Sequence, residues 1–359
     1  MYRGSIVVAI PARNEAERIL TCLRALARQT CRPQTVLVLA NNCSDETAAI
    51  ASRATSEFPY RLQVIRHCFP EQDAHAGYAR RLAMALSEQL ARSDGVLLTT
   101  DADAVPAPDW IERNCKAIAD GADLVCGRVA LDPLEAGLIP SRVHADDALE
   151  RRLVELLDRI ADRLDPDRAD PLPRHTEAAG ASLAVTTAAF RRVGGIPAVP
   201  SGEDRAFVRA LASVDAQIRH DPSVLVLVSG RTVGRAPGGM ADTIRRRIQQ
   251  QDEFTDDQVE PAVDAYRRYD FRRRVRQAWQ ERLLPSELVI DLGIPTHVLA
   301  QMLAEPYFGR AWASIEAASP FLTHRRVRFT ELSRQIAHAV HLLHHHNEGD
   351  LVCDAGEPP

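Results

Sequence analysis

The 359-residue sequence has little of several features that mark common protein classes. Among its 44 lysine and arginine residues only Lys116 is a lysine, and Ala117 follows it, so the Gly-Lys-Ser/Thr phosphate loop of P-loop enzymes is absent. The net charge of −5 leaves no positive field for unspecific nucleic-acid binding. Apolar runs such as residues 224–228 are far shorter than the ~20 residues of a membrane span. We therefore expect no nucleic-acid partner and no transmembrane segment.

The seven cysteines are scattered along the chain, and no two are spaced as Cys-x-x-Cys. An odd number of dispersed cysteines is typical of reduced thiols and argues against a disulfide framework or a zinc site. The first residues pass directly into a short apolar run and lack the small-residue cleavage site of a signal peptide. The sequence therefore predicts a soluble, cytoplasmic protein.

Over the first 130 residues, short β-branched runs alternate with segments of helical spacing. The expected strands cover residues 5–10, 35–40, 62–65, 95–100 and 124–129, and the expected helices lie near 15–29, 45–57, 77–91 and 107–120. Apolar strands separated by helices predict an α/β fold with a mostly parallel sheet covered on both faces. Ligands bind such sheets beyond the carboxyl ends of the strands.

The second part of the chain changes from mixed to helical patterns. We expect a charged helix at 145–165, a proline-rich loop at 165–173, a strand at 181–186 with a helix to 193, a helix at 203–214 and a strand at 223–228. A loop rich in glycine and arginine follows at 229–239. The prediction is a catalytic domain over residues 1–238 and a helical extension over residues 239–359, which offers a surface for a homo-oligomer.

Asp101 and Asp103 follow an apolar strand and give the strongest local signal for chemistry. At the two-residue period of a strand both carboxylates point to the same side, where they repel each other unless a cation is close. Mg²⁺ and Mn²⁺ prefer such oxygen ligands, so the pair predicts a divalent metal site shared with a diphosphate. The structural alternative is that Asp103 caps the helix that starts near Pro106 or Pro108.

Polar loops follow the first two strands. Pro11 stands where a dinucleotide-binding fold has its glycines, which disfavours a dehydrogenase. Asn14 and Ser44 are candidate helix caps, and Asp45 favours the dipole of the following helix. The alternative is that the short polar side chains of 41–45, Asn42 among them, bind the edge of a nucleobase and a ribose.

Two helix starts carry charges with two interpretations each. Arg80 and Arg81 are either solvated surface residues or face an anion, because a positive charge in a first turn opposes the helix dipole. Glu203 and Asp204 either stabilise a helix N-terminus or provide a general base for an acceptor hydroxyl. The histidines at 338–346 have helical metal spacing, but no carboxylates surround them, so we expect a solvated helix end there.

The chain contains, in order, Pro-Ala-Arg-Asn-Glu from residue 11, Asn-Asn-Cys-Ser-Asp-Glu-Thr from 41, Gly-Tyr-Ala-Arg from 77, Asp-Ala-Asp from 101 and Gly-Glu-Asp from 202. This ordered set resembles family 2 glycosyltransferases with the GT-A fold, over about residues 5–235. The resemblance implies a role for each matching residue. Pro11, Arg13 and Glu15 would line the nucleotide pocket, Asp45 would contact the base, Arg80 the base or diphosphate, Asp101 the ribose or metal shell and Asp103 the metal, and Asp204 would be the catalytic base with Glu203 beside it.

The sequence departs from the pattern at one point. Related enzymes sometimes supply a late histidine to the metal, whereas the matching stretch here reads Ser229-Gly230-Arg231. We therefore expect Arg231 or Arg235 to help neutralise the diphosphate.

The sequence thus predicts a glycosyltransferase that uses Mn²⁺ or Mg²⁺ and moves a sugar from a nucleoside diphosphate sugar to a hydroxyl acceptor of unspecified kind. Two alternatives stay open. A nucleotidyltransferase of related fold usually carries a glycine-rich, basic loop after its first strand, which residues 11–13 lack. A catalytically silent nucleotide-sugar-binding protein is disfavoured by the intact acidic residues.

Overall fold

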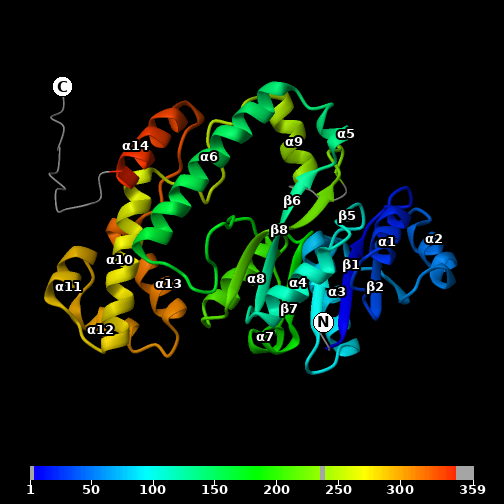
Figure 1. Ribbon diagram of the computed structural model, residues 1–359, viewed down its shortest axis with the longest axis horizontal. Helices are drawn as coiled ribbons and strands as arrows, with labels where there is room; N and C mark the ends of the chain where they lie inside the picture. Colours follow the sequence, from blue (N-terminus) through cyan, green and yellow to red (C-terminus); the bar gives the residue numbers. More distant parts are fainter. Residues whose placement is uncertain (1–3, 235–238, 345–359) are drawn as a thin grey trace.

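An eight-stranded sheet forms the centre of the first part of the chain, and helices cover both of its faces (Figure 1). The computed structural model describes residues 4–234 and 239–344. From edge to edge, the strands are β3 (Arg61–His67), β2 (Thr35–Asn41), β1 (Ile6–Ala12), β4 (Val96–Thr99), β7 (Leu183–Thr186), β6 (Leu124–Leu131), β8 (Ile218–Val228) and β5 (Val105–Pro106). Only β7 and β5 run against their neighbours. The expected α/β fold with a mostly parallel sheet is confirmed.

Burial on both faces explains why the central strands are apolar without alternation. Ile6, Val8 and Ile10 belong to the core shared with α1 and α4, while Val7 and Ala9 belong to the core shared with α3 and α8. The helices around the sheet are α1 (Ile19–Ala27), α2 (Thr47–Arg53), α3 (Ala76–Leu90), α4 (Trp110–Ala119), α7 (Thr187–Arg192) and α8 (Glu203–Ala212), with short 3₁₀ segments η1 (Ala54–Glu57) and η2 (Glu71–Asp73).

Beyond the sheet the chain is helical, as expected. The short α5 (Pro133–Ala136) leads into the long α6 (Ser141–Leu164), which passes over the sheet to the C-terminal helices (Figure 1). The later elements are α9 (Met240–Gln249), α10 (Ala262–Glu281), α11 (Ser286–Leu292), α12 (Thr296–Leu303), α13 (Phe308–Ala318), η3 (Pro320–Leu322), η4 (Phe329–Glu331) and α14 (Leu332–His344). Leu153, Leu156 and Ile160 of α6 share a buried core with α10 and α14.

Several local expectations need correction. The helix expected from residue 107 begins at Trp110, so the alternative in which Asp103 caps it is wrong. β8 begins at residue 218, not 223, because it continues through a bulge opposite Gly127 and Arg128 that hides the strand pattern. The two-residue β5 and the single-turn α5 were not expected, since both are too short to show a period.

Other expectations concern location and assembly. Among residues 4–234 and 239–344, no helix has the length and apolar character needed to cross a membrane. Six cysteines are free thiols, and Cys353 lies outside the described residues. The domain boundary expected at residue 238 also falls outside them, and both it and the homo-oligomer stay predictions.

One close contact joins α13 to the end of α8. Both carboxylate oxygens of Asp215 accept hydrogen bonds from the first turn of α13, from the backbone N–H groups of Phe308 at 2.8 Å and Gly309 at 2.7 Å. A Cβ at Gly309 would lie 1.9 Å from the carbonyl oxygen of Ala212. The helical extension therefore packs on α8 through a contact that only glycine allows.

We predict that Gly309→Ala lowers the free energy of unfolding by about 1–3 kcal/mol, because the backbone clash outweighs the roughly 1 kcal/mol that alanine gains over glycine in a helix. Urea denaturation measures the change. Gly137→Ala is the matched control, since the nearest atom to its Cβ is 3.5 Å away, and it should stay within about 0.5 kcal/mol of the parent. Equal stability of the two variants would contradict the prediction.

Candidate active site

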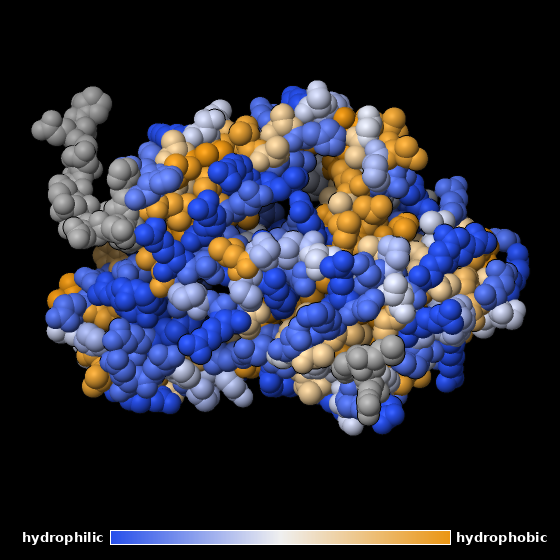
Figure 2. Space-filling view, in the orientation of Figure 1, coloured by the Kyte–Doolittle hydropathy of each residue, from blue (hydrophilic) through white to orange (hydrophobic). Residues whose placement is uncertain are grey.

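A cleft of about 1300 Å³ opens at the carboxyl edge of the sheet, between the strand ends and α6. Figure 2 shows hydrophilic residues along much of the molecular surface around it. Most of the candidate residues line this cleft: Pro11, Arg13, Glu15, Arg80, Asp101, Asp103, Glu203, Asp204 and Arg231. The parallel pairing of β1 with β2 and β4 accounts for this, because their carboxyl ends, and the loops that follow, lie at one edge.

Arg80 is buried below the cleft and donates hydrogen bonds to four parts of the chain. Its Nε donates to Oε1 of Glu203 at 2.9 Å, and its Nη2 donates to Oδ1 of Asp101 at 2.7 Å. Its Nη1 donates to Oγ1 of Thr99 at 2.9 Å and to the carbonyl oxygen of Gly180 at 2.8 Å. Burial alone would lower the pKa of Arg80, but the charges of Asp101 and Glu203 raise it, so the guanidinium stays charged.

Two glycines make room for this arrangement. A Cβ at Gly180 would lie 2.4 Å from Cζ of Arg80, and a Cβ at Gly77 would lie 2.2 Å from the carbonyl oxygen of Val199. Glycine is therefore required at Gly180 for the turn at residues 180–181 to approach Arg80 of α3, and at Gly77 for α3 to approach the segment that precedes α8. Arg81, the other candidate in this helix turn, donates to the carbonyl oxygen of Ile196 and has a structural contact instead.

Arg231 joins Glu15 to Asp103. Its two terminal nitrogens donate to the two carboxylate oxygens of Glu15 at 2.9 and 2.6 Å, and Nη2 lies 3.1 Å from Oδ2 of Asp103. The bidentate geometry fits the fork of a guanidinium group. Arg13 is used differently, since its Nη1 donates to the carbonyl oxygen of Ala74 at 2.7 Å.

The cluster contains more negative than positive charge. Among the residues that the structure describes, the four carboxylates of Glu15, Asp101, Asp103 and Glu203 form ion pairs with two guanidinium groups, those of Arg80 and Arg231. The pKa of Asp103 is raised to about 6, first by burial and then by the charges of Asp101 and Glu15, against the opposing charge of Arg231.

Asp204 lies in the first turn of α8, after Gly202 in the left-handed conformation with φ of 70°. Its Oδ2 accepts a hydrogen bond from the backbone N–H of Gly180 at 2.9 Å, and its Oδ1 accepts one from Arg205 N–H at 2.7 Å. These bonds fix a carboxylate that is only half-buried at the cleft wall. Glu203 beside it is buried and held by Arg80.

The structure does not bring Asn42 and Asp45 into the cleft. The Asn42 side chain is bonded at both ends to the backbone of Phe69. Asp45 accepts hydrogen bonds from the backbone N–H groups of Ala16 and Thr47 and borders a smaller adjoining pocket of about 350 Å³. Its predicted contact with the base stays a prediction, and Arg235 lies outside the described residues.

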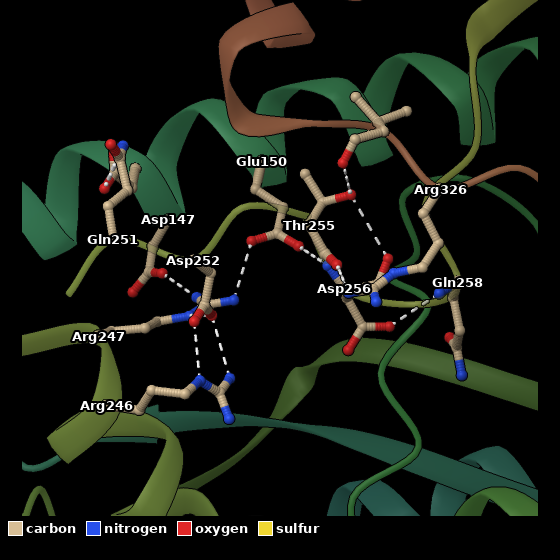
Figure 3. Close-up of polar contacts among 12 residues, drawn as sticks. Asp147, Glu150, Arg246, Arg247, Gln251, Asp252, Thr255, Asp256, Gln258 and Arg326 are labelled. Carbon is tan, nitrogen blue, oxygen red and sulfur yellow. Dashed lines mark hydrogen bonds and ion pairs between the residues drawn. The ribbon is translucent and has the colours of Figure 1, made fainter.

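The far wall of the cleft was not expected from the sequence. Arg247 of α9 pairs with Asp147 and Glu150 of α6, and Glu150 accepts a hydrogen bond from the backbone N–H of Asp256 (Figure 3). Asp256 in turn accepts from Arg205, the neighbour of Asp204, at 2.8 Å. No local sequence pattern indicates this wall. Its residues are ordinary charged residues, and partners such as Arg205 and Asp256 are more than 50 positions apart in the sequence.

Metal ligation by protein groups alone is not favoured. Within the part of the chain that the structure describes, no three His, Cys, Asp or Glu side chains are grouped to hold a metal ion. His338, His341 and His344 lie on α14, while His345 and His346 are outside the described residues.

The fold and the cleft together define an α/β protein with an acidic, arginine-bearing site at the carboxyl edge of its sheet. Residues 7–171 match the profile of glycosyl transferase family 2. Glycosyltransferase AglE of Haloferax volcanii is 28% identical over 187 residues, which are 49% of this chain and 58% of that protein. The match thus spans little more than half of the relative's length. Residues 7–171 are thus similar to glycosyl transferase family 2, the family that the motifs predict.

Two solved structures are similar to the chain. One is mannosyltransferase PcManGT of Pyrobaculum calidifontis in complex with GDP-Man and Mn²⁺, with a TM-score of 0.46 and 18% identity, covering 96% of this chain and 82% of that one. The other is residues 1–349 of S. aureus TarS in complex with UDP-GlcNAc, with a TM-score of 0.46 and 15% identity, covering 87% and 91%.

We predict that Arg80→Met lowers the free energy of unfolding by about 3–5 kcal/mol, because Glu203 is then buried without its counter-charge. Urea denaturation measures the loss, and the double variant Arg80→Met/Glu203→Gln should recover part of it. The exposed pair of Arg113 and Asp109 provides the control, since Arg113→Met should cost less than about 1 kcal/mol. A loss in Arg80→Met no larger than in this control would show that the buried pair does not stabilise the site.

Proposed function

We propose that the protein transfers a sugar from a nucleoside diphosphate sugar to a hydroxyl group, with Mn²⁺ or Mg²⁺ bound at Asp101 and Asp103. The observation that supports this most is the meeting of Glu15, Asp101 and Asp103 with Arg231 at the mouth of the cleft. Glu15, Asp101 and Asp103 lie within residues 7–171, the segment that matches the family. The free thiols support a cytoplasmic location for this activity.

The residues at this point fit a divalent cation. Carboxylate oxygens are the ligands that Mg²⁺ and Mn²⁺ prefer, and the cluster has two negative charges beyond those its arginines neutralise. Asp103 and Asp101 would hold the ion, with the donor diphosphate supplying further oxygens. When bound, the metal neutralises negative charge on the diphosphate.

Arginine supplies the remaining positive charge. As the bond between the sugar and the diphosphate breaks, the electron pair stays on the departing phosphate oxygen, and Arg231 stabilises this charge from the cleft. Arg80 is a positioning residue in this scheme, because its bonds to Asp101 and Glu203 orient both carboxylates without contact with the substrate.

Asp204 is the proposed general base. Its carboxylate takes the proton of the acceptor hydroxyl while the acceptor oxygen forms its bond to the anomeric carbon. The backbone N–H groups that bond to Asp204 fix the orientation of its carboxylate at the cleft wall. The far wall with Arg205 and Asp256 leaves room for an acceptor opposite the donor residues.

We predict that Asp103→Ala removes the Mn²⁺-dependent part of UDP and GDP binding and slows transfer roughly 100-fold or more, since one electrostatic partner of the diphosphate is lost. Calorimetric titration with each nucleotide, with and without Mn²⁺, measures the binding. Asp120→Ala is the control, because Asp120 is exposed and pairs with Lys116 outside the cleft. Unchanged Mn²⁺ dependence in Asp103→Ala would place the metal elsewhere.

Asp204→Asn should lower turnover by about 100-fold or more while donor affinity stays the same, because asparagine still accepts the N–H of Gly180 but takes no proton. Release of nucleoside diphosphate from a panel of donors and acceptors measures turnover. Parental rates in the variant would refute the base assignment. Donor binding without turnover by the parent on any acceptor would favour a silent binding protein.

A further inference from the structure

Arg128 of β6 is one of the arginines of the cleft that form no ion pair with the described residues. Arg80, Arg174, Arg205, Arg231 and Arg247 each pair with at least one carboxylate. Arg128 lines the same cleft and is half-buried, yet it has neither an ion pair nor a hydrogen bond to any of the described residues. A half-buried charge in a cleft with many carboxylates normally pairs with one of them. Its lack of a partner indicates that the backbone holds it for another anion.

The backbone at Arg128 lies opposite a β-bulge of β8. The register between β6 and β8 shifts between Gly127 and Arg128. A Cβ at Gly127 would lie 2.1 Å from Oγ of Ser182 and 2.6 Å from Cγ1 of Val224, so only glycine allows this approach. Bulges often redirect a side chain beside a functional site. The nearby carboxylate of Glu177 accepts a hydrogen bond from the backbone N–H of Val129 and leaves Arg128 unpaired.

Arg128 lies next to the segment that holds the candidate base. The backbone N–H of Gly127 donates to the carbonyl oxygen of Ser182 at 2.8 Å. Two residues earlier in that segment, the backbone N–H of Gly180 donates to Asp204 at 2.9 Å. Arg128 is therefore on the strand next to the segment that bonds to the candidate base, and both residues line the same cleft.

The side chain of His175, which has an unused hydrogen-bond donor, lies close to Arg128. Nδ1 of His175 accepts from the backbone N–H of Glu177, which leaves the proton of the neutral ring on Nε2, and that buried atom has no hydrogen-bond partner. The pKa of His175 is lowered to about 4, first by burial and then by the positive charge of His220, with Arg128 adding to the effect. Arg151 on α6 also lines the cleft without a partner.

From these contacts we infer that Arg128 binds an anionic group of the acceptor, a phosphate or a carboxylate, close to the hydroxyl that Asp204 deprotonates. This inference rests on the proposed function for the identity of the acceptor. The binding of the anion itself depends only on the free guanidinium and its position.

The test is calorimetric titration with three probes of similar size: glycerol 3-phosphate, glycerate and glycerol. The protein is titrated alone and again when saturated with UDP or GDP and Mn²⁺, so that anion binding at the metal is separated from binding at Arg128. The variants are Arg128→Gln, Arg128→Lys and Arg24→Gln. Arg24 is an exposed arginine of α1 that lacks a partner and lies outside the cleft, which makes it the matched control.

The parent should bind at least one of the two anions and bind glycerol much more weakly. Arg128→Gln should weaken anion binding at least tenfold, Arg128→Lys should keep part of it, and Arg24→Gln should leave it unchanged. Circular dichroism and thermal unfolding verify that the variants are folded. Comparison of the affinities for glycerol 3-phosphate and glycerate shows whether the site prefers a phosphate or a carboxylate.

Three results would overturn the inference: neither anion binds better than glycerol, Arg128→Gln binds the anions as the parent does, or Arg128→Gln weakens nucleotide binding instead. Nucleotide binding is measured in the same samples. A parent that binds neither anion better than glycerol, or an Arg128→Gln variant that binds the anions as the parent does, would refute only the role of Arg128 when nucleotide binding is intact, whereas absence of nucleotide binding with Mn²⁺ in the parent would refute the proposed function.

Discussion

The buried guanidinium of Arg80 holds the site together. Its five N–H groups form a planar fork. They donate hydrogen bonds to the carboxylates of Asp101 and Glu203, the hydroxyl of Thr99 and the carbonyl oxygen of Gly180. A charge so far from water is stable only while its partners stay in place. The positions of Asp101, Glu203 and Gly180 are therefore coupled, and Asp204 follows because it bonds to Gly180.

The carboxylates at the mouth of the cleft differ from those around Arg80 because their charges are not fully balanced. Glu15, Asp101 and Asp103 converge where Arg231 approaches from the glycine-rich loop, and the raised pKa of Asp103 reflects its burial and then the nearby charges of Asp101 and Glu15. A permanently buried pair such as that of Arg80 and Glu203 gives rigidity. An incompletely balanced cluster gives affinity for a cation and for the oxygens that it shares, which is the property a diphosphate site needs.

The far wall joins the two parts of the chain. Contacts run from Arg247 of α9 to Glu150 of α6 and on to Asp256 (Figure 3). Asp256 in turn bonds to Arg205 at the start of α8. On the other side, Asp215 and Gly309 join the end of α8 to α13. α8, which carries the candidate base, is thus held at both ends by residues from the helical part. The helices after residue 239 complete the cleft as well as enclosing a core of their own.

Much of the fold follows from local patterns. Continuous apolar strands separated by helices predicted the sheet. The order of short motifs predicted the family, the strand end that Asp101 follows and the helix starts at which Arg80 and Asp204 lie. These features can be predicted because they depend on neighbours in the sequence. This holds for the periods of strands and helices and for the residues that follow parallel strands. Three features could not be predicted from the sequence: the bulge of β8 opposite Gly127, the start of β8 and the hydrogen bonds of Asn42 to Phe69. Each depends on a partner far away in the chain.

The sequence by itself determined the class of fold, the family of residues 7–171 and the set of acidic and basic residues from which a site is assembled. Only the tertiary structure decided which arginine meets which carboxylate, that Asp103 lines the cleft and does not cap a helix, and that Arg128 has no partner among the described residues. The physical reason is that ion pairing and burial are set by distances between segments, and those distances exist only after the sheet, α6 and α8 have packed together.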